Sequence, residues 1–143
     1  MTEKTLIYDG SFGGFLCCVF YVFEYKLQNV SIQNEFTVQN GLFSENEKII
    51  TDKEKSDRVW TALKEKVSST SSTKIYYAFL SEHLGVENTL LDYLQYIFKN
   101  KQRVDTNFTY ASVLKTAQIA KNVSREKHRM EAFVRFRLTK DNV

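Results

Sequence analysis

The apolar stretch from Phe12 to Phe23 limits the possible folds of this chain more than any other feature. It is shorter than the roughly 20 residues that a membrane-spanning helix needs, so we expect it to be buried inside the protein. The turn Asp9-Gly10-Ser11 precedes it, and Ser11 is a suitable helix N-cap. Aromatic and β-branched side chains would also suit a buried strand. The turn and cap signals favour a helix from Phe12 to about Lys26, apolar nearly all round and therefore central.

Apolar periodicity predicts further helices along the chain. The segment Ser68 to Ser72 (SSTSS) has low complexity and predicts a flexible connector between two of them. Trp60 shares a helical stripe with Leu63 and Val67, which predicts a core position. The expected helices run from a capping box with Thr51 as N-cap and Glu54 at N3 to about Val67, from about Lys74 to Leu84 with Gly85 as the stop, from about Glu87 to Lys99, and from about Phe108 to Arg129.

Strands are expected mainly at the two ends of the chain. Thr5 to Tyr8 predicts a short strand, and the alternation from Glu131 to Thr139 predicts a half-buried one. Between them, Gln28 to Phe43 fits short strands or irregular loop equally well, and Lys48 to Ile50 fits one strand. We therefore predict an α+β fold, predominantly helical, with about five helices and a small sheet that includes the first and last strands. With 143 residues, the chain suits a single domain.

Positive charge is concentrated at the C-terminal end. The net charge of the chain is +3, and from Lys121 onward seven cations stand against three anions. Arg135 and Arg137 share a predicted strand face with Phe133, a row that suits phosphate contacts and base stacking. A solvated strand face is the alternative interpretation. The predicted nucleic-acid-binding residues are Lys121, Arg125, Arg129, Arg135 and Arg137.

The same segment holds the candidates for catalysis. Glu126, His128 and Arg129 lie close together where the last helix is expected to end. Glu126 and Arg129 are also spaced to form a structural pair on that helix. The residues alone leave open whether the protein is an enzyme.

No metal site or cofactor is predicted. Cys17 and Cys18 are adjacent within the apolar helix, where they are expected to be buried small side chains. Neither CxxC nor HExxH occurs, although His83 and His128 could ligate a metal. The glycines of residues 9–14 match no phosphate-binding motif, so a tight turn is favoured over an anion site. Unpaired cysteines fit a cytoplasmic protein without a membrane segment.

Several stretches resemble a bacterial family known as domain of unknown function 4130, or probable DNA metabolism protein. Residues 6–16 (LIYDGSFGGFL) resemble the opening motif of that family. Glu126 to Phe136 resembles its E-x-H-R-M-x-G-F-V-R-F motif. Val59-Trp60 and the segment Ala78 to Gly85 are similar to two motifs between these ends.

The resemblance implies a setting but no reaction. Family members are usually encoded beside a radical-SAM protein assigned to DNA modification or repair, so that protein and DNA are the expected partners. The sequence departs from the family at Gly13, where Glu is more common, and at Ala132, which replaces Gly. Members typically continue beyond the last motif, so this chain is expected to represent the N-terminal portion.

Three functions are consistent with these features. The first is an accessory protein of DNA metabolism that contacts nucleic acid and acts with the radical-SAM partner. The second is an enzyme acting on DNA bases through Glu126, His128 and Arg129. The third is a protein-binding adaptor without DNA contact.

Overall fold

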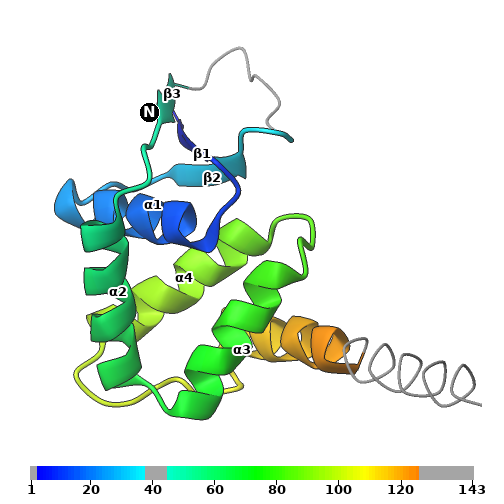
Figure 1. Cartoon of the computed structure of the whole chain (residues 1–143). Helices are drawn as coiled ribbons and strands as arrows, with labels where there is room; N and C mark the ends of the chain where they lie inside the picture. Colours follow the sequence, from blue (N-terminus) through cyan, green and yellow to red (C-terminus); the bar gives the residue numbers. More distant parts are fainter. Residues whose placement is uncertain (1–2, 38–44, 126–143) are drawn as a thin grey trace, which may run out of the picture.

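The computed structural model describes residues 3–37 and 45–125 and has a small sheet at one end of a helical body (Figure 1). The sheet contains β1 (Lys4–Tyr8), β2 (Val30–Asn34) and β3 (Glu45–Lys48), in the order β2-β1-β3 and parallel throughout. The helices are α1 (Phe12–Glu24), α2 (Lys53–Lys66), α3 (Ser69–Leu80), α4 (Val86–Lys99) and a further helix over residues 111–125. The predicted α+β, mostly helical class is confirmed.

The sheet differs in part from the prediction. The first strand is confirmed as β1, at the centre of the sheet. The expected last strand, Glu131 to Thr139, lies outside the described residues. The ambiguous segment after α1 supplies β2, and β3 begins earlier than the strand predicted at Lys48 to Ile50.

Helix α1 occupies the central position predicted for it. It lies between the sheet and the helical body (Figure 1), which explains why it is apolar on nearly all sides. Phe15, Cys18 and Val19 are completely buried, and Ser11 caps the helix by accepting a hydrogen bond from the Gly14 backbone N–H. The principal core is formed by Leu6, Phe15, Val19, Val22, Ile32, Leu63, Ile75, Leu90, Leu94 and Val113.

The first turn of α4 joins the sheet to the helices. The Tyr8 hydroxyl at the end of β1 donates to Glu87 Oε2 at 3.2 Å. The Asn88 side-chain oxygen accepts from the backbone N–H of Ile32 in β2 at 3.0 Å. Two strands that neighbour each other in the sheet are therefore fixed to one helix end.

The serine-rich segment is helical, so the prediction of a flexible connector was wrong. Ser68 is the N-cap, and Ser69 begins α3. Asp105, from a distant loop, accepts hydrogen bonds from the Ser71 hydroxyl at 2.6 Å and the Ser68 backbone N–H at 3.2 Å. A carboxylate at a helix N-terminus is favoured by the helix dipole. The Ser68 side chain caps α3 locally by accepting from the Ser71 backbone N–H, and the tertiary contact with Asp105 adds stability to a segment whose serines are weak helix formers.

The positions of three helix ends also differ from the prediction. Asp52, not Thr51, caps α2, because its side chain accepts from the Glu54 backbone N–H at 3.0 Å. Helix α3 ends at Leu80, and Glu82 rather than Gly85 takes the left-handed conformation after it. Gly85, with φ of 80°, precedes α4 instead. The last helix begins at residue 111, three residues later than predicted.

Thr116 offers a test of packing in the last helix. Its side chain is 1% exposed, and its hydroxyl has no hydrogen-bond partner among the described residues. Burying a hydroxyl without a partner is unfavourable, so Thr116→Val is expected to raise the free energy of unfolding by about 1 kcal/mol. Urea denaturation would measure this, with the exposed α2 substitution Thr61→Val as a control expected to change little. A loss of stability in Thr116→Val would show that the hydroxyl is bonded.

Candidate nucleic-acid interface

Two of the predicted site residues lie in the described part of the chain. Lys121 and Arg125 are one helical turn apart on the helix over residues 111–125, and both are exposed. The remaining candidates lie outside the described residues, and for them the sequence prediction stands as it was. They are Glu126, His128 and Arg129 for catalysis, and Arg129, Arg135 and Arg137 for nucleic-acid binding.

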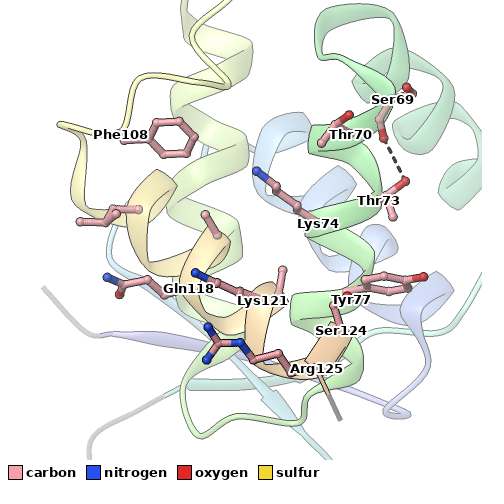
Figure 2. A pocket seen from close by; sticks show the side chains of 13 residues that line it. Ser69, Thr70, Thr73, Lys74, Tyr77, Phe108, Gln118, Lys121, Ser124 and Arg125 are labelled. Carbon is pink, nitrogen blue, oxygen red and sulfur yellow. Dashed lines mark hydrogen bonds between the residues drawn. The ribbon is translucent and has the colours of Figure 1, made fainter. Parts of the chain in front are cut away.

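Lys121 and Arg125 line a groove between α3 and the last helix, called here the α3 groove (Figure 2). Its volume is about 700 Å³, which lies within the usual range for ligand sites. Both cations therefore face a concave surface. The groove is lined by Ser69, Thr70, Thr73, Lys74, Tyr77, Phe108, Leu114, Ala117, Gln118, Ala120, Lys121, Ser124 and Arg125.

The charge of the α3 groove has one sign. Lys74 from α3 joins Lys121 and Arg125 from the facing helix, and among the described residues no carboxylate lines the groove. Figure 2 shows all three cationic side chains around the same groove. A concave surface lined by one sign of charge concentrates the potential inside it. The α3 groove is therefore suited to an anionic ligand.

The wall and floor of the groove are partly apolar. The Phe108 ring is 45% exposed, and the Lys74 ammonium lies 5.6 Å from its centroid. Leu114 is 43% exposed beside Ala117 on the last helix. The small side chains of Ala117 and Ala120 leave room between the two helices, and the Phe108 ring adds a flat apolar surface to the groove.

Of the thirteen described residues that line the groove, only Lys121 and Arg125 are predicted from the sequence as site residues. Lys74 and Phe108 were predicted only as helix beginnings, and the Ser69 side of the groove was placed in a connector. These residues come from segments far apart in the sequence, and no spacing rule relates them. The positive charge at residues 121 and 125 was the only sequence signal for the site.

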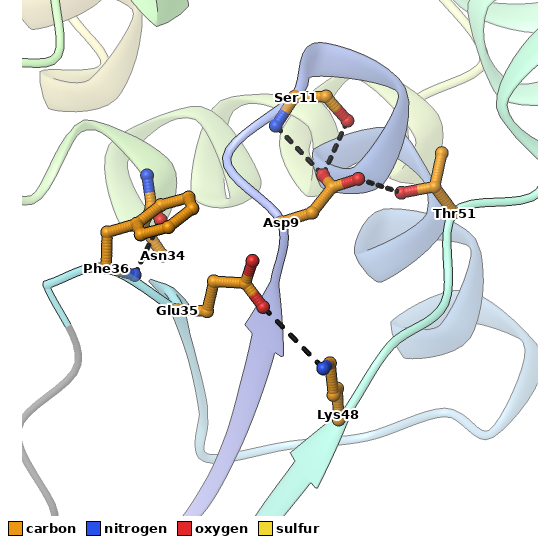
Figure 3. A network of polar contacts seen from close by, with 7 residues as sticks. All are labelled: Asp9, Ser11, Asn34, Glu35, Phe36, Lys48 and Thr51. Carbon is orange, nitrogen blue, oxygen red and sulfur yellow. Dashed lines mark hydrogen bonds and ion pairs between the residues drawn. The ribbon is translucent and has the colours of Figure 1, made fainter.

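The turn between β1 and α1 is closed by its own carboxylate (Figure 3). Asp9 accepts hydrogen bonds from the Ser11 backbone N–H at 2.9 Å, the Ser11 hydroxyl at 2.6 Å and the Thr51 hydroxyl at 2.8 Å. The hydrogen bonds from Ser11 hold the pKa of Asp9 below its usual value. A fixed negative charge at this helix N-terminus opposes anion binding. The geometry supports the tight-turn interpretation of the glycines.

The cysteines lie inside the fold. Cys17 Sγ accepts from the Asp52 backbone N–H at 3.2 Å, and burial raises the pKa of the Cys18 thiol. Residues 3–37 and 45–125 contain no group of three or more His, Cys, Asp or Glu side chains placed to hold a metal. His83 is exposed in the turn before α4.

Trp60 packs against the edge of the core. It is only partly buried, and its ring meets Phe12 edge-on at a centroid distance of 5.2 Å. The predicted core position is met only in part, because the side chain packs against the core cluster but is not itself buried. Trp60 is not among the residues that line the α3 groove.

Comparison with known protein families finds a match in the second part of the chain. In the described residues, no helix combines the length and apolar character required to cross a membrane. No curated protein and no solved structure was found to be similar. Residues 85–143, which include α4 and the helix that carries Lys121 and Arg125, match the model of the family described as Domain of unknown function (DUF4130).

Proposed function

We propose that this protein is a nucleic-acid-associated accessory protein of DNA metabolism, with the α3 groove as its contact surface. The observation that carries the proposal is that Lys74, Lys121 and Arg125 line one groove, to which the described residues contribute no carboxylate. Phosphate oxygens are the groups that such cations bind. The arginine fork additionally suits two oxygens of one phosphate.

The partner is proposed from the family resemblance. Members of the family that the chain resembles are usually encoded beside a radical-SAM protein, and we propose that this protein delivers or holds DNA for that enzyme. The purified chain of 143 residues and the radical-SAM protein would be mixed with and without DNA and analysed by size-exclusion chromatography. Co-elution is expected, and separate elution under both conditions would contradict the partnership. That result would not bear on DNA binding by the chain alone, which fluorescence anisotropy measures separately.

Loss of the two groove cations gives the direct test of nucleic-acid contact. The double substitution Lys121→Ala with Arg125→Ala is expected to weaken DNA binding on the order of ten-fold at 0.1 M salt. The slope of log affinity against log salt should also flatten by about 0.7 for each single-strand phosphate contact that is lost. Fluorescence anisotropy across a salt series would measure both quantities.

A matched pair of α2 cations provides the control. Lys53 and Arg58 are exposed, and neither lines the α3 groove. Lys53→Ala with Arg58→Ala removes the same charge and the same residue types. If both double variants weaken binding equally, general positive charge and not the groove is responsible. No DNA affinity in the native protein would favour the adaptor function, for which the apolar part of the groove would be the contact.

A further inference from the structure

The shape of the α3 groove discriminates between forms of nucleic acid. Its cations lie in a hollow between two helices, where Lys74 faces the helix that carries Lys121 and Arg125 (Figure 2). Proteins that read a duplex insert a protruding helix or ribbon into its major groove. A duplex is too wide to enter a hollow of about 700 Å³. A single strand is thin and flexible enough to enter.

The aromatic ring at the edge of the groove points to the same ligand. Phe108 is 45% exposed, yet the loop that carries it is fixed by hydrogen bonds. The Tyr93 hydroxyl donates to the Asp105 carbonyl at 2.7 Å, and the Asn107 amide donates to the Tyr96 hydroxyl at 2.7 Å. An exposed phenyl ring on an ordered loop, together with nearby cations, is a combination that single-strand sites use for base stacking. Paired bases expose no ring face for such stacking.

We propose that the α3 groove binds single-stranded nucleic acid, with one unpaired base stacked on Phe108 and the adjacent phosphates held by Lys121 and Arg125. This inference rests on the proposed function, because it specifies the ligand of the same groove. The Lys74 ammonium lies over the Phe108 ring, 5.6 Å from its centroid, so a base that stacks on that face would displace it towards the neighbouring phosphate. The Ser69 and Thr70 hydroxyls, on the same α3 wall as Lys74, supply neutral donors, whereas the Thr73 hydroxyl already donates to the Ser69 carbonyl at 2.9 Å.

The test separates the contribution of the bases from that of the phosphates. Fluorescence anisotropy of the full chain would compare three ligands of equal length: a single-stranded oligonucleotide, its abasic equivalent and the duplex. The single strand is expected to bind at least about five-fold more tightly than the abasic strand, the low end of the effect of stacking one base. Phe108→Ala should remove that difference, whereas Phe108→Tyr should preserve it. Lys121→Ala with Arg125→Ala should weaken binding of both strands.

Each failure has a distinct meaning. Equal affinity for the single strand and the abasic strand, or tighter binding of the duplex, would overturn this inference and leave nucleic-acid contact intact. Absence of binding to all three ligands would overturn the proposed function as well. An acidic amphipathic peptide that binds the groove when no oligonucleotide does would identify a protein-binding surface instead. The comparison of ligands on the native chain decides the question even if Phe108→Ala fails to fold.

Discussion

Gly14→Ala is expected to lower the free energy of unfolding by about 1–2 kcal/mol, although alanine normally stabilises a helix. A Cβ atom at this position would lie 2.5 Å from Asp9 Oδ1 and 2.9 Å from Thr51 Oγ1. Both atoms belong to the hydrogen-bonded network that closes the β1–α1 turn (Figure 3). The substitution would therefore cause overpacking and separate hydrogen-bonded partners at the same time.

The adjacent glycine is a matched control for this effect. A Cβ atom on Gly13 would lie 3.5 Å from the Thr51 methyl carbon, an ordinary contact. Gly13→Ala should therefore raise the free energy of unfolding by about 0.5–1 kcal/mol, the usual gain for this exchange in a helix. Urea denaturation of both variants would measure the gap between them. If the two variants were equally stable and Gly14→Ala lost binding of inorganic phosphate, the β1–α1 turn would be a phosphate site and not only a tight turn.

Asp105→Ala is expected to destabilise the protein by about 3 kcal/mol, because hydrogen bonds to a charged acceptor contribute about 1.5–3 kcal/mol. Asp105 is 4% exposed and accepts from the Ser71 hydroxyl, the Ser68 backbone N–H and the Ser68 hydroxyl. Its removal leaves the buried Ser71 hydroxyl without this acceptor and takes the negative charge from the start of α3. Asp92→Ala, at an exposed position on α4, should change stability by less than about half a kcal/mol.

The dependence of this effect on pH follows from the pKa of Asp105. Burial acts to raise the pKa, but the hydrogen bonds from Ser71 and Ser68 outweigh it and hold the pKa below the usual value. A lowered pKa in the folded state means that the contribution is complete above the unfolded value of about 3.9 and is lost as the pH falls below it. The stability difference between native protein and Asp105→Asn should shrink over that range. A constant difference down to pH 2 would show that the charge does not contribute.

Local sequence signals were sufficient where an element depends on its own residues. Helix α1 has an N-cap and a preceding turn, so its start was predictable. Its side chains are apolar on nearly all sides, so its central position was predictable as well. Helix α4 carries a regular apolar stripe, and its bounds were predicted within one residue. Hydrophobic periodicity encodes which face of such a helix is buried, because burial drives its formation.

Tertiary contacts decided the elements for which local preferences were weak or contradictory. Serine-rich sequence disfavours a helix interior, yet α3 begins at Ser69, because Ser68 caps it and Asp105 accepts hydrogen bonds from the Ser68 backbone N–H and the Ser71 hydroxyl. Asp52 caps α2, whereas the Thr51 hydroxyl donates to Asp9. Which of the two residues is the N-cap therefore depends on the position of Asp9 at the end of β1.

The candidate site shows the same division. Positive charge at Lys121 and Arg125 was visible in the sequence, because charge is a property of each residue alone. That Lys74 and Phe108 face those cations across a groove depends on how α3 packs against the last helix. Side chains distant in sequence are brought together only by the packing of the core, and a single sequence carries no spacing from which that meeting could be deduced.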